Sequence, residues 1–62
     1  MALIPAERQS RIVDLVSQRP AVGIAELTRL LKVSHMTVRR DIRSLEEAGR
    51  VIAIAGGVRL AD

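Results

Sequence analysis

The ten residues V-S-H-M-T-V-R-R-D-I, which run from Val33 to Ile42, decide how this chain folds. Ser34 is predicted to cap a helix that begins at His35, because its side chain can accept a hydrogen bond from a backbone N–H that the first helical turn leaves unpaired. Apolar residues then recur at the i, i+4, i+7 spacing of a buried helix face. The residues predicted to form that face are Val38, Ile42, Leu45 and Gly49.

The other side of this helix is predicted to be exposed and rich in arginine. Arg43 follows Arg39 by four residues and Arg40 by three, and each like-charge pair destabilises an isolated helix by roughly a few tenths of a kcal/mol. Glu46 or Glu47 can pair with Arg43. In contrast, Arg39 and Arg40 have no acidic residue three or four positions away. The cluster indicates an anion-binding surface, and a solvated charged surface is the alternative. The residues predicted on this side or at its margins are His35, Met36, Thr37, Arg39, Arg40, Arg43, Ser44 and Glu47.

The composition predicts one small domain with an aliphatic core. The chain has 62 residues, of which 48% are hydrophobic, and none is Phe, Trp or Tyr. The core must therefore be packed from Ile, Leu, Val, Ala and Met. Because aromatic side chains form the platforms on which unpaired bases stack, their absence argues against single-strand or loop-RNA recognition. Among nucleic acids, duplex DNA is the better partner.

Charge and the lack of cysteine narrow the class of protein further. Ten basic and seven acidic residues give a net charge of +3, which is consistent with a polyanionic partner. Without cysteine the fold has neither disulfides nor thiolate metal sites. Residues 1–5 lack the charged and apolar regions of a signal peptide, and no apolar run approaches the roughly 18 residues of a membrane span. We therefore expect a cytoplasmic protein that does not bind membranes.

Several residues have the right chemistry for catalysis or metal binding but the wrong arrangement. Ser34, His35 and Asp41 are the residue types of a hydrolase triad, yet adjacent helical residues point about 100° apart and cannot form the relay. A zinc site lacks ligands, because His35 is the only histidine. Gly56 and Gly57 are followed by no helix and no P-loop lysine. The sequence therefore predicts no enzyme, no metal and no cofactor, and Asp41 is expected to pair with a basic group of another helix or a backbone N–H.

Two helices are predicted before the arginine-rich helix. The first runs from about Pro5 to Gln18, with Ile12, Leu15 and Val16 inside and Val13 alongside. After a short extended piece at residues 21–22, Gly23 can cap the second helix. Its predicted inner side consists of Ile24, Leu27, Leu30 and Leu31. Few residues separate this helix from Ser34, which is the geometry of a helix-turn-helix.

A β-hairpin is predicted to follow. The arginine-rich helix should end at Gly49. Two β-prone stretches, Arg50–Ile54 and Val58–Leu60, are joined by Ala55-Gly56-Gly57, whose glycines can adopt the positive φ of a tight turn. This order predicts a mostly α fold with a small β-hairpin, a winged helix-turn-helix of three helices plus a wing. Residues 1–4 are expected to be flexible and 5–60 to form the domain, with the helix-turn-helix at about 22–48 and the wing at about 50–60.

From Ala6 to Leu60 the chain resembles the N-terminal DNA-binding domain of DeoR-type bacterial transcriptional regulators. The motifs that carry the resemblance are E-R-Q-S-R-I at 7–12, E-L at 26–27, V-S-x-x-T-V-R-R-D-I at 33–42, L-E-x-x-G at 45–49 and G-G-V at 56–58. The resemblance implies that the third helix enters the major groove of DNA. It also implies a longer, homo-oligomeric repressor whose C-terminal domain, absent from these 62 residues, senses a phosphorylated sugar or related metabolite.

In such a domain, Met36 and Arg40 would reach base edges, with Arg40 the candidate for a bidentate contact to guanine. Further candidate contacts, mainly to phosphate, are Ser34, His35, Thr37, Arg39 and Arg43, with Arg8, Arg11, Arg50 and Arg59 less strongly indicated.

The wing departs from the family pattern, which usually places basic residues or histidine before the two glycines. Here the residues are Ala53, Ile54 and Ala55. The apolar hairpin could therefore pack against protein instead of DNA. A winged helix that binds a protein partner is the alternative to a DNA-binding domain.

Overall fold

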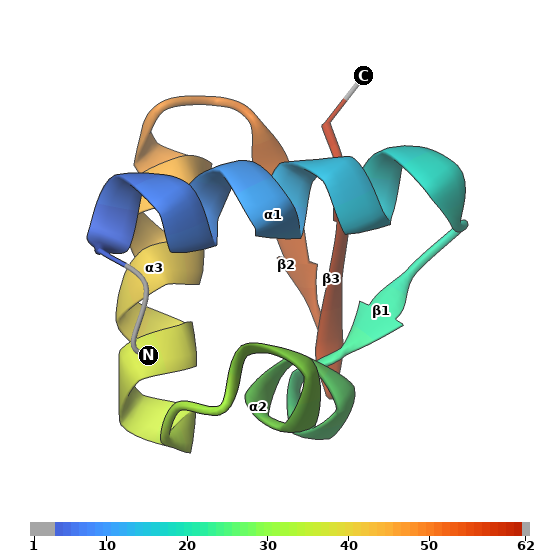
Figure 1. The fold of residues 1–62 in the computed structure, drawn as a ribbon. Coiled ribbons are helices and arrows are strands. Elements are labelled where there is room, and N and C mark those ends of the chain that lie inside the picture. Colours follow the sequence, from blue (N-terminus) through green and yellow to red (C-terminus); the bar gives the residue numbers. More distant parts are fainter. Residues whose placement is uncertain (1–3, 62) are drawn as a thin grey trace.

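The computed structural model describes residues 4–61, and within them the chain forms three helices and a three-stranded sheet (Figure 1). The helices are α1 (Pro5–Gln18), α2 (Ile24–Leu31) and α3 (His35–Glu47). The strands are β1 (Val22–Gly23), β2 (Val51–Ile54) and β3 (Gly57–Leu60). The predicted winged helix-turn-helix is thereby confirmed. Apart from Ile4, the flexible N-terminus predicted at residues 1–4 lies outside the described residues.

The predicted limits of α1 are correct, and proline explains both of them. Pro5 occupies the first turn, where its fixed φ suits the helix and its missing N–H removes no hydrogen bond. At the other end Arg19 adopts an extended conformation with φ −136° and ψ 150°. A residue before proline is driven out of the helical region, so Arg19-Pro20 ends the helix.

The turn between α2 and α3 depends on Lys32, which adopts the left-handed conformation with φ 57°. Its backbone N–H donates to the Thr28 carbonyl, and the Val33 N–H donates to the same carbonyl at 3.3 Å. This conformation is sterically unfavourable for a residue with a Cβ atom, and the sequence patterns did not predict it. It changes the chain direction sharply within a few residues and brings Ser34 to the start of α3.

The sheet has the order β1-β3-β2, with both pairs antiparallel. The predicted hairpin pairs Val51 with Leu60, but the extended piece near residue 22 also pairs with β3, which was not predicted. Gly57 lies opposite Gly23, and a Cβ atom on Gly57 would lie only 2.5 Å from the Val22 carbonyl oxygen. The hairpin turn itself is Ala55-Gly56, with Gly56 at φ 75°.

The core is aliphatic, as predicted, and lies between the helices and the sheet. The buried hydrophobic residues are Ile12, Val16, Val22, Leu27, Leu31, Val38, Ile42, Leu45, Val51 and Val58. Neither alanine nor methionine belongs to this set among residues 4–61. Two predicted inner positions are wrong: Leu30 is 50% exposed because α2 turns it to solvent, and Gly49 is exposed because α3 ends before it. Gly49 instead takes a positive φ of 76° just past the helix.

The helices hold α3 from two sides. Helix α1 crosses the upper part of α3 and of β3, while α2 lies beside the first turns of α3, across the short turn (Figure 1). Helix α3 also packs against β2, so its inner face is fully engaged. Within the described part of the chain, no helix is both long and apolar enough to cross a membrane.

Candidate nucleic-acid interface

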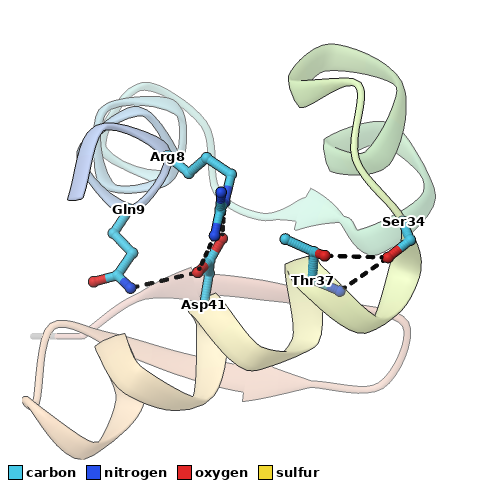
Figure 2. Close-up of polar contacts among 5 residues, drawn as sticks. All are labelled: Arg8, Gln9, Ser34, Thr37 and Asp41. Atoms are coloured by element: carbon cyan, nitrogen blue, oxygen red, sulfur yellow. Dashed lines mark hydrogen bonds and ion pairs between the residues drawn. The ribbon is translucent and has the colours of Figure 1, made fainter. Parts of the chain in front are cut away.

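The start of α3 is fixed by the predicted serine cap. The Ser34 hydroxyl oxygen accepts a hydrogen bond from the Thr37 backbone N–H at 3.2 Å, and the Ser34 hydroxyl donates to Thr37 Oγ1 at 3.2 Å (Figure 2). Thr37 is half-buried, not fully exposed as predicted, because it turns back toward the cap. These contacts hold the first turn of α3 in place. Its unpaired backbone N–H groups make this end favourable for an anion.

The inner face of α3 fixes which side chains point outward. Val38, Ile42 and Leu45 are buried as predicted, with Val38 fully inaccessible to solvent. Because the helix repeats every 3.6 residues, burial of this face turns the opposite face to solvent. The exposed residues of α3 include His35, Met36, Arg39, Arg40 and Arg43.

A groove of about 560 Å³ runs between the exposed face of α3 and the turn of the hairpin. Its lining combines three arginines and Met36 of α3 with small and aliphatic residues of the wing and of α2. The full lining is Ile24, Met36, Arg39, Arg40, Ile42, Arg43, Glu46, Ala53, Ile54, Gly56 and Gly57. The structure therefore brings four of the predicted site residues together in one concave surface.

The electrostatics of this arginine groove favour an anionic ligand. Arg39, Arg40 and Arg43 form neither an ion pair nor a side-chain hydrogen bond with any of residues 4–61. The predicted local pairing of Arg43 with Glu46 or Glu47 is thus absent. Glu46 is the one acidic residue in the lining, against three arginines. Like charges held this close together lose part of their mutual repulsion when an anion binds between them.

Asp41 forms the predicted contact with another helix. Arg8 of α1 donates from Nε to Asp41 Oδ2 at 2.5 Å and from Nη2 to Oδ1 at 3.2 Å, and Gln9 Nε2 donates to Oδ1 at 3.4 Å (Figure 2). The hydrogen bonding that Arg8 donates to the Asp41 carboxylate raises the pKa of the Arg8 guanidinium, against the opposing effect of desolvation. The Asp41 side chain is 2% exposed and that of Arg8 is 12% exposed. This geometry favours a positioning role for Arg8 over the phosphate contact considered from the sequence.

The remaining predicted contacts lie outside the arginine groove. Arg11 is exposed beside a separate depression between α1 and α2, lined also by Asp14, Leu15, Leu30 and Leu31. Arg50 is exposed in the connection between α3 and β2, and Arg59 is half-buried in β3 opposite Ile52. Ser34, His35 and Thr37 lie at the N-terminal end of α3. Within residues 4–61 no group of three or more His, Cys, Asp or Glu side chains could hold a metal ion.

Sequence reasoning missed several residues of the groove. Ile24 was assigned to the core, and it does pack against the core, but it is only half-buried and also lines the groove. Glu46 was considered only as a partner of Arg43. Glu46 follows Arg43 by three residues, a spacing that puts both side chains on the same helix face. The sequence could therefore have predicted that Glu46 lies beside Arg43 in the groove. Ala53 and Ile54 line the groove because the hairpin folds toward α3, and no local sequence pattern predicts this direction of folding.

Comparisons with known proteins agree on one family. The model of the DeoR-like helix-turn-helix domain matches residues 8–62. An uncharacterized HTH-type transcriptional regulator of Haemophilus influenzae is 52% identical over 60 residues, which are 97% of this chain and 23% of that protein. The uncharacterized HTH-type transcriptional regulator YgbI of Escherichia coli is 47% identical over 57 residues, which are 92% of this chain and 22% of that protein. The lactose phosphotransferase system repressor of Streptococcus mutans is 43% identical over 53 residues (86% and 21%). The chain spans less than a quarter of each of these relatives. No solved structure matches it significantly.

Proposed function

Because this chain belongs to the DeoR-like helix-turn-helix family, whose members named above are transcriptional regulators, we propose that it reads specific sequences in double-stranded DNA through the major groove. The observation that carries the proposal is the arginine groove. Three arginines that have no partner among the described residues, and one exposed methionine, lie on a helix that is capped at its start and packed along its inner face. A helix presented in this way fits the width of the major groove.

Within this proposal the residues of α3 divide into two roles. Arg40 and Met36, near the start of the helix, reach base edges, and Arg40 can donate two hydrogen bonds to O6 and N7 of guanine. Ser34, His35, Thr37, Arg39 and Arg43 contact phosphates and fix the position of the helix on the duplex. Arg50 and Arg59 lie near the ends of the wing strands and are secondary candidates for phosphate contact.

For the whole protein, we propose a bacterial repressor of genes for the use of sugars or related metabolites. The support is the name of one relative, the lactose phosphotransferase system repressor of Streptococcus mutans. A region outside residues 1–62 would bind the phosphorylated-sugar effector and join the subunits into an oligomer. This chain, residues 5–60, would supply the DNA contacts.

The test is a titration of the ¹⁵N-labelled chain with duplex DNA, combined with selection of bound sequences from a random duplex pool. We expect an enriched consensus and chemical-shift changes centred on residues 34–43. Binding should be weak for a single domain, on the order of micromolar, and should weaken steeply between about 50 and 200 mM salt. Binding that did not change with salt, or a pool without enrichment, would overturn the proposal.

Two exposed apolar residues of the wing support a second candidate function. Ile54 is 40% exposed and Leu60 is 38% exposed, on a hairpin that carries no basic residue at its turn. Such a surface suits contact with another protein. In that case the same titration would leave residues 34–43 unperturbed by DNA.

A further inference from the structure

Met36 is the most exposed large hydrophobic residue among residues 4–61, at 72%. Single exposed hydrophobic residues are common on protein surfaces, so exposure alone indicates nothing. The surroundings of Met36 are more informative, because it lines the same groove as Arg39, Arg40 and Arg43. It therefore presents an unbranched, apolar and polarizable side chain on a surface otherwise suited to an anion.

The spacing of Met36 and Arg40 relates the two side chains to each other. They are four residues apart on α3, so they project from the same helix face with Cβ atoms about 5–6 Å apart. Successive bases along one DNA strand are separated by about 3.4 Å along the helix axis. A helix that places Arg40 on one base pair therefore places Met36 on a base pair one or two steps away.

The chemistry of methionine limits which base edge it can recognise. Its thioether sulfur is a weak acceptor, and the side chain has no hydrogen-bond donor with which to read the acceptors of guanine, adenine or thymine. The major-groove edge of thymine presents an apolar group, the 5-methyl, which the other three DNA bases lack. Contact with that methyl would remove apolar surface of both partners from water.

From this arrangement we infer that Met36 selects a thymine by its 5-methyl group, one or two base pairs from the guanine contacted by Arg40. The inference rests on the proposed DNA-reading function and specifies part of its target. A half-site should therefore contain a thymine and a guanine at a fixed short spacing. One buried methyl group contributes about 0.8 kcal/mol, which corresponds to a factor of about four in Kd.

The experiment compares thymine with deoxyuridine, which lacks only the methyl group. Duplexes carrying the consensus selected by the wild-type chain are made with one thymine at a time replaced by deoxyuridine. We expect Kd to rise about fourfold at one thymine within two base pairs of the guanine that Arg40→Ala ceases to select, and to change little at the others. Met36→Leu should keep this preference for thymine over deoxyuridine, whereas Met36→Gln, of similar length but polar, should abolish it.

Leu30→Gln is the matched control, because Leu30 is an exposed apolar residue that lines the separate α1–α2 depression. It should retain the full preference for thymine. Circular dichroism would establish that all variants fold. If the wild-type chain enriches a consensus but no thymine responds to loss of its methyl, or the response persists in Met36→Gln, the inference about Met36 is wrong. If no consensus is enriched at all, the proposed function itself fails.

Discussion

Arg8 and Asp41, 33 positions apart in the chain, join α1 to α3 through two hydrogen bonds of 2.5 and 3.2 Å. Asp41 lies between Arg40, which is exposed, and Ile42, which is buried. The pair therefore constrains the rotation of α3 about its own axis next to two residues that line the arginine groove. Together with the buried face of α3, it determines which way the groove residues point.

Removal of Arg8 and removal of Asp41 should lower the free energy of unfolding by different amounts. Arg8→Ala leaves the Asp41 carboxylate, 2% exposed, with the 3.4 Å hydrogen bond from Gln9 as its one remaining side-chain partner among residues 4–61. We expect the free energy of unfolding to fall by about 3 kcal/mol. Asp41→Ala should cost less, because the long Arg8 side chain can turn toward water. Since the chain has no Trp or Tyr, urea unfolding would be followed by far-UV circular dichroism.

The exposed Ser10→Ala variant is the control for α1 and should unfold like the wild type. The combined Arg8→Met and Asp41→Leu variant should be more stable than Arg8→Ala, because it leaves no uncompensated buried charge. Equal losses for Arg8→Ala and Ser10→Ala would show that the ion pair contributes nothing to stability.

Gly57 should tolerate a side chain far less well than Gly23, its partner across the β1–β3 pair. A Cβ atom on Gly57 would lie 2.5 Å from the Val22 carbonyl oxygen and 3.2 Å from the Val22 carbonyl carbon, and backbone atoms cannot rotate away. Gly57→Ala is expected to cost about 2 kcal/mol and to separate β1 from β3. On Gly23 the nearest atom would be at an ordinary 3.7 Å, so Gly23→Ala is the matched control. Similar urea midpoints for the two variants would contradict the close approach.

The sequence predicted the elements whose cause is local and missed those whose cause is remote. Pro5 and Ser34 mark helix starts by their own chemistry, so both starts were predicted correctly. Leu30 was misassigned because the 3.6-residue period allowed a wide inner face, whereas only Leu27 and Leu31 of α2 are buried. Whether Leu30 is also covered depends on how α1 lies over α2, and this is a property of the tertiary packing.

The candidate site, too, was predicted where its cause is local and missed where its cause is remote. The arginines of α3 and their lack of acidic partners at helical spacing could be read from the sequence. The participation of Ile24 and Ile54 could not, because it requires β1 to pair with β3 and the hairpin to fold toward α3. The sequence predicted that Asp41 pairs with a basic group of another helix or with a backbone N–H, but it did not identify Arg8 as the partner.

The ion pair between Arg19 and Glu26 should make stability depend on pH in the acidic range. Arg19 Nη1 donates to Glu26 Oε2 at 2.6 Å, and this hydrogen bond lowers the pKa of Glu26 below its ordinary value of 4.5. The folded chain therefore binds the proton less readily than the unfolded chain. The stabilisation is complete above pH 4.5 and is lost as the pH falls through the lowered pKa.

Glu26→Gln should accordingly melt below the wild type at about pH 7, and the difference should shrink as the pH falls through the lowered pKa of Glu26, where the wild-type carboxyl also becomes neutral. The effect should be small and sensitive to salt, because both side chains are partly exposed. Arg19→Gln should also melt below the wild type at about pH 7, and this difference in melting temperature should likewise shrink as the pH falls. A melting deficit of Glu26→Gln that stayed constant as the pH was lowered far below 4.5 would rule out this origin.

Arg40 and Arg39 are neighbours in the arginine groove, yet their substitution should change DNA binding in different ways. Under the proposed function Arg40→Ala loses a bidentate contact to guanine. The variant should bind the selected site more weakly by about 1–3 kcal/mol and should lose its preference at one base pair. Arg39→Ala loses a phosphate contact. It should weaken selected and scrambled duplexes alike and reduce the slope of log K against log salt by about one.

Titrations of both variants on the selected and the scrambled duplex, each at several salt concentrations, separate these two roles. Neither arginine has a protein partner within residues 4–61, so a loss of binding cannot be attributed to a broken ion pair inside the fold. Glu46→Gln removes the one acidic residue of the groove lining and should strengthen binding to both duplexes. Equal losses on the two duplexes for Arg40→Ala would remove its base-reading role and leave it, like Arg39, as a phosphate contact.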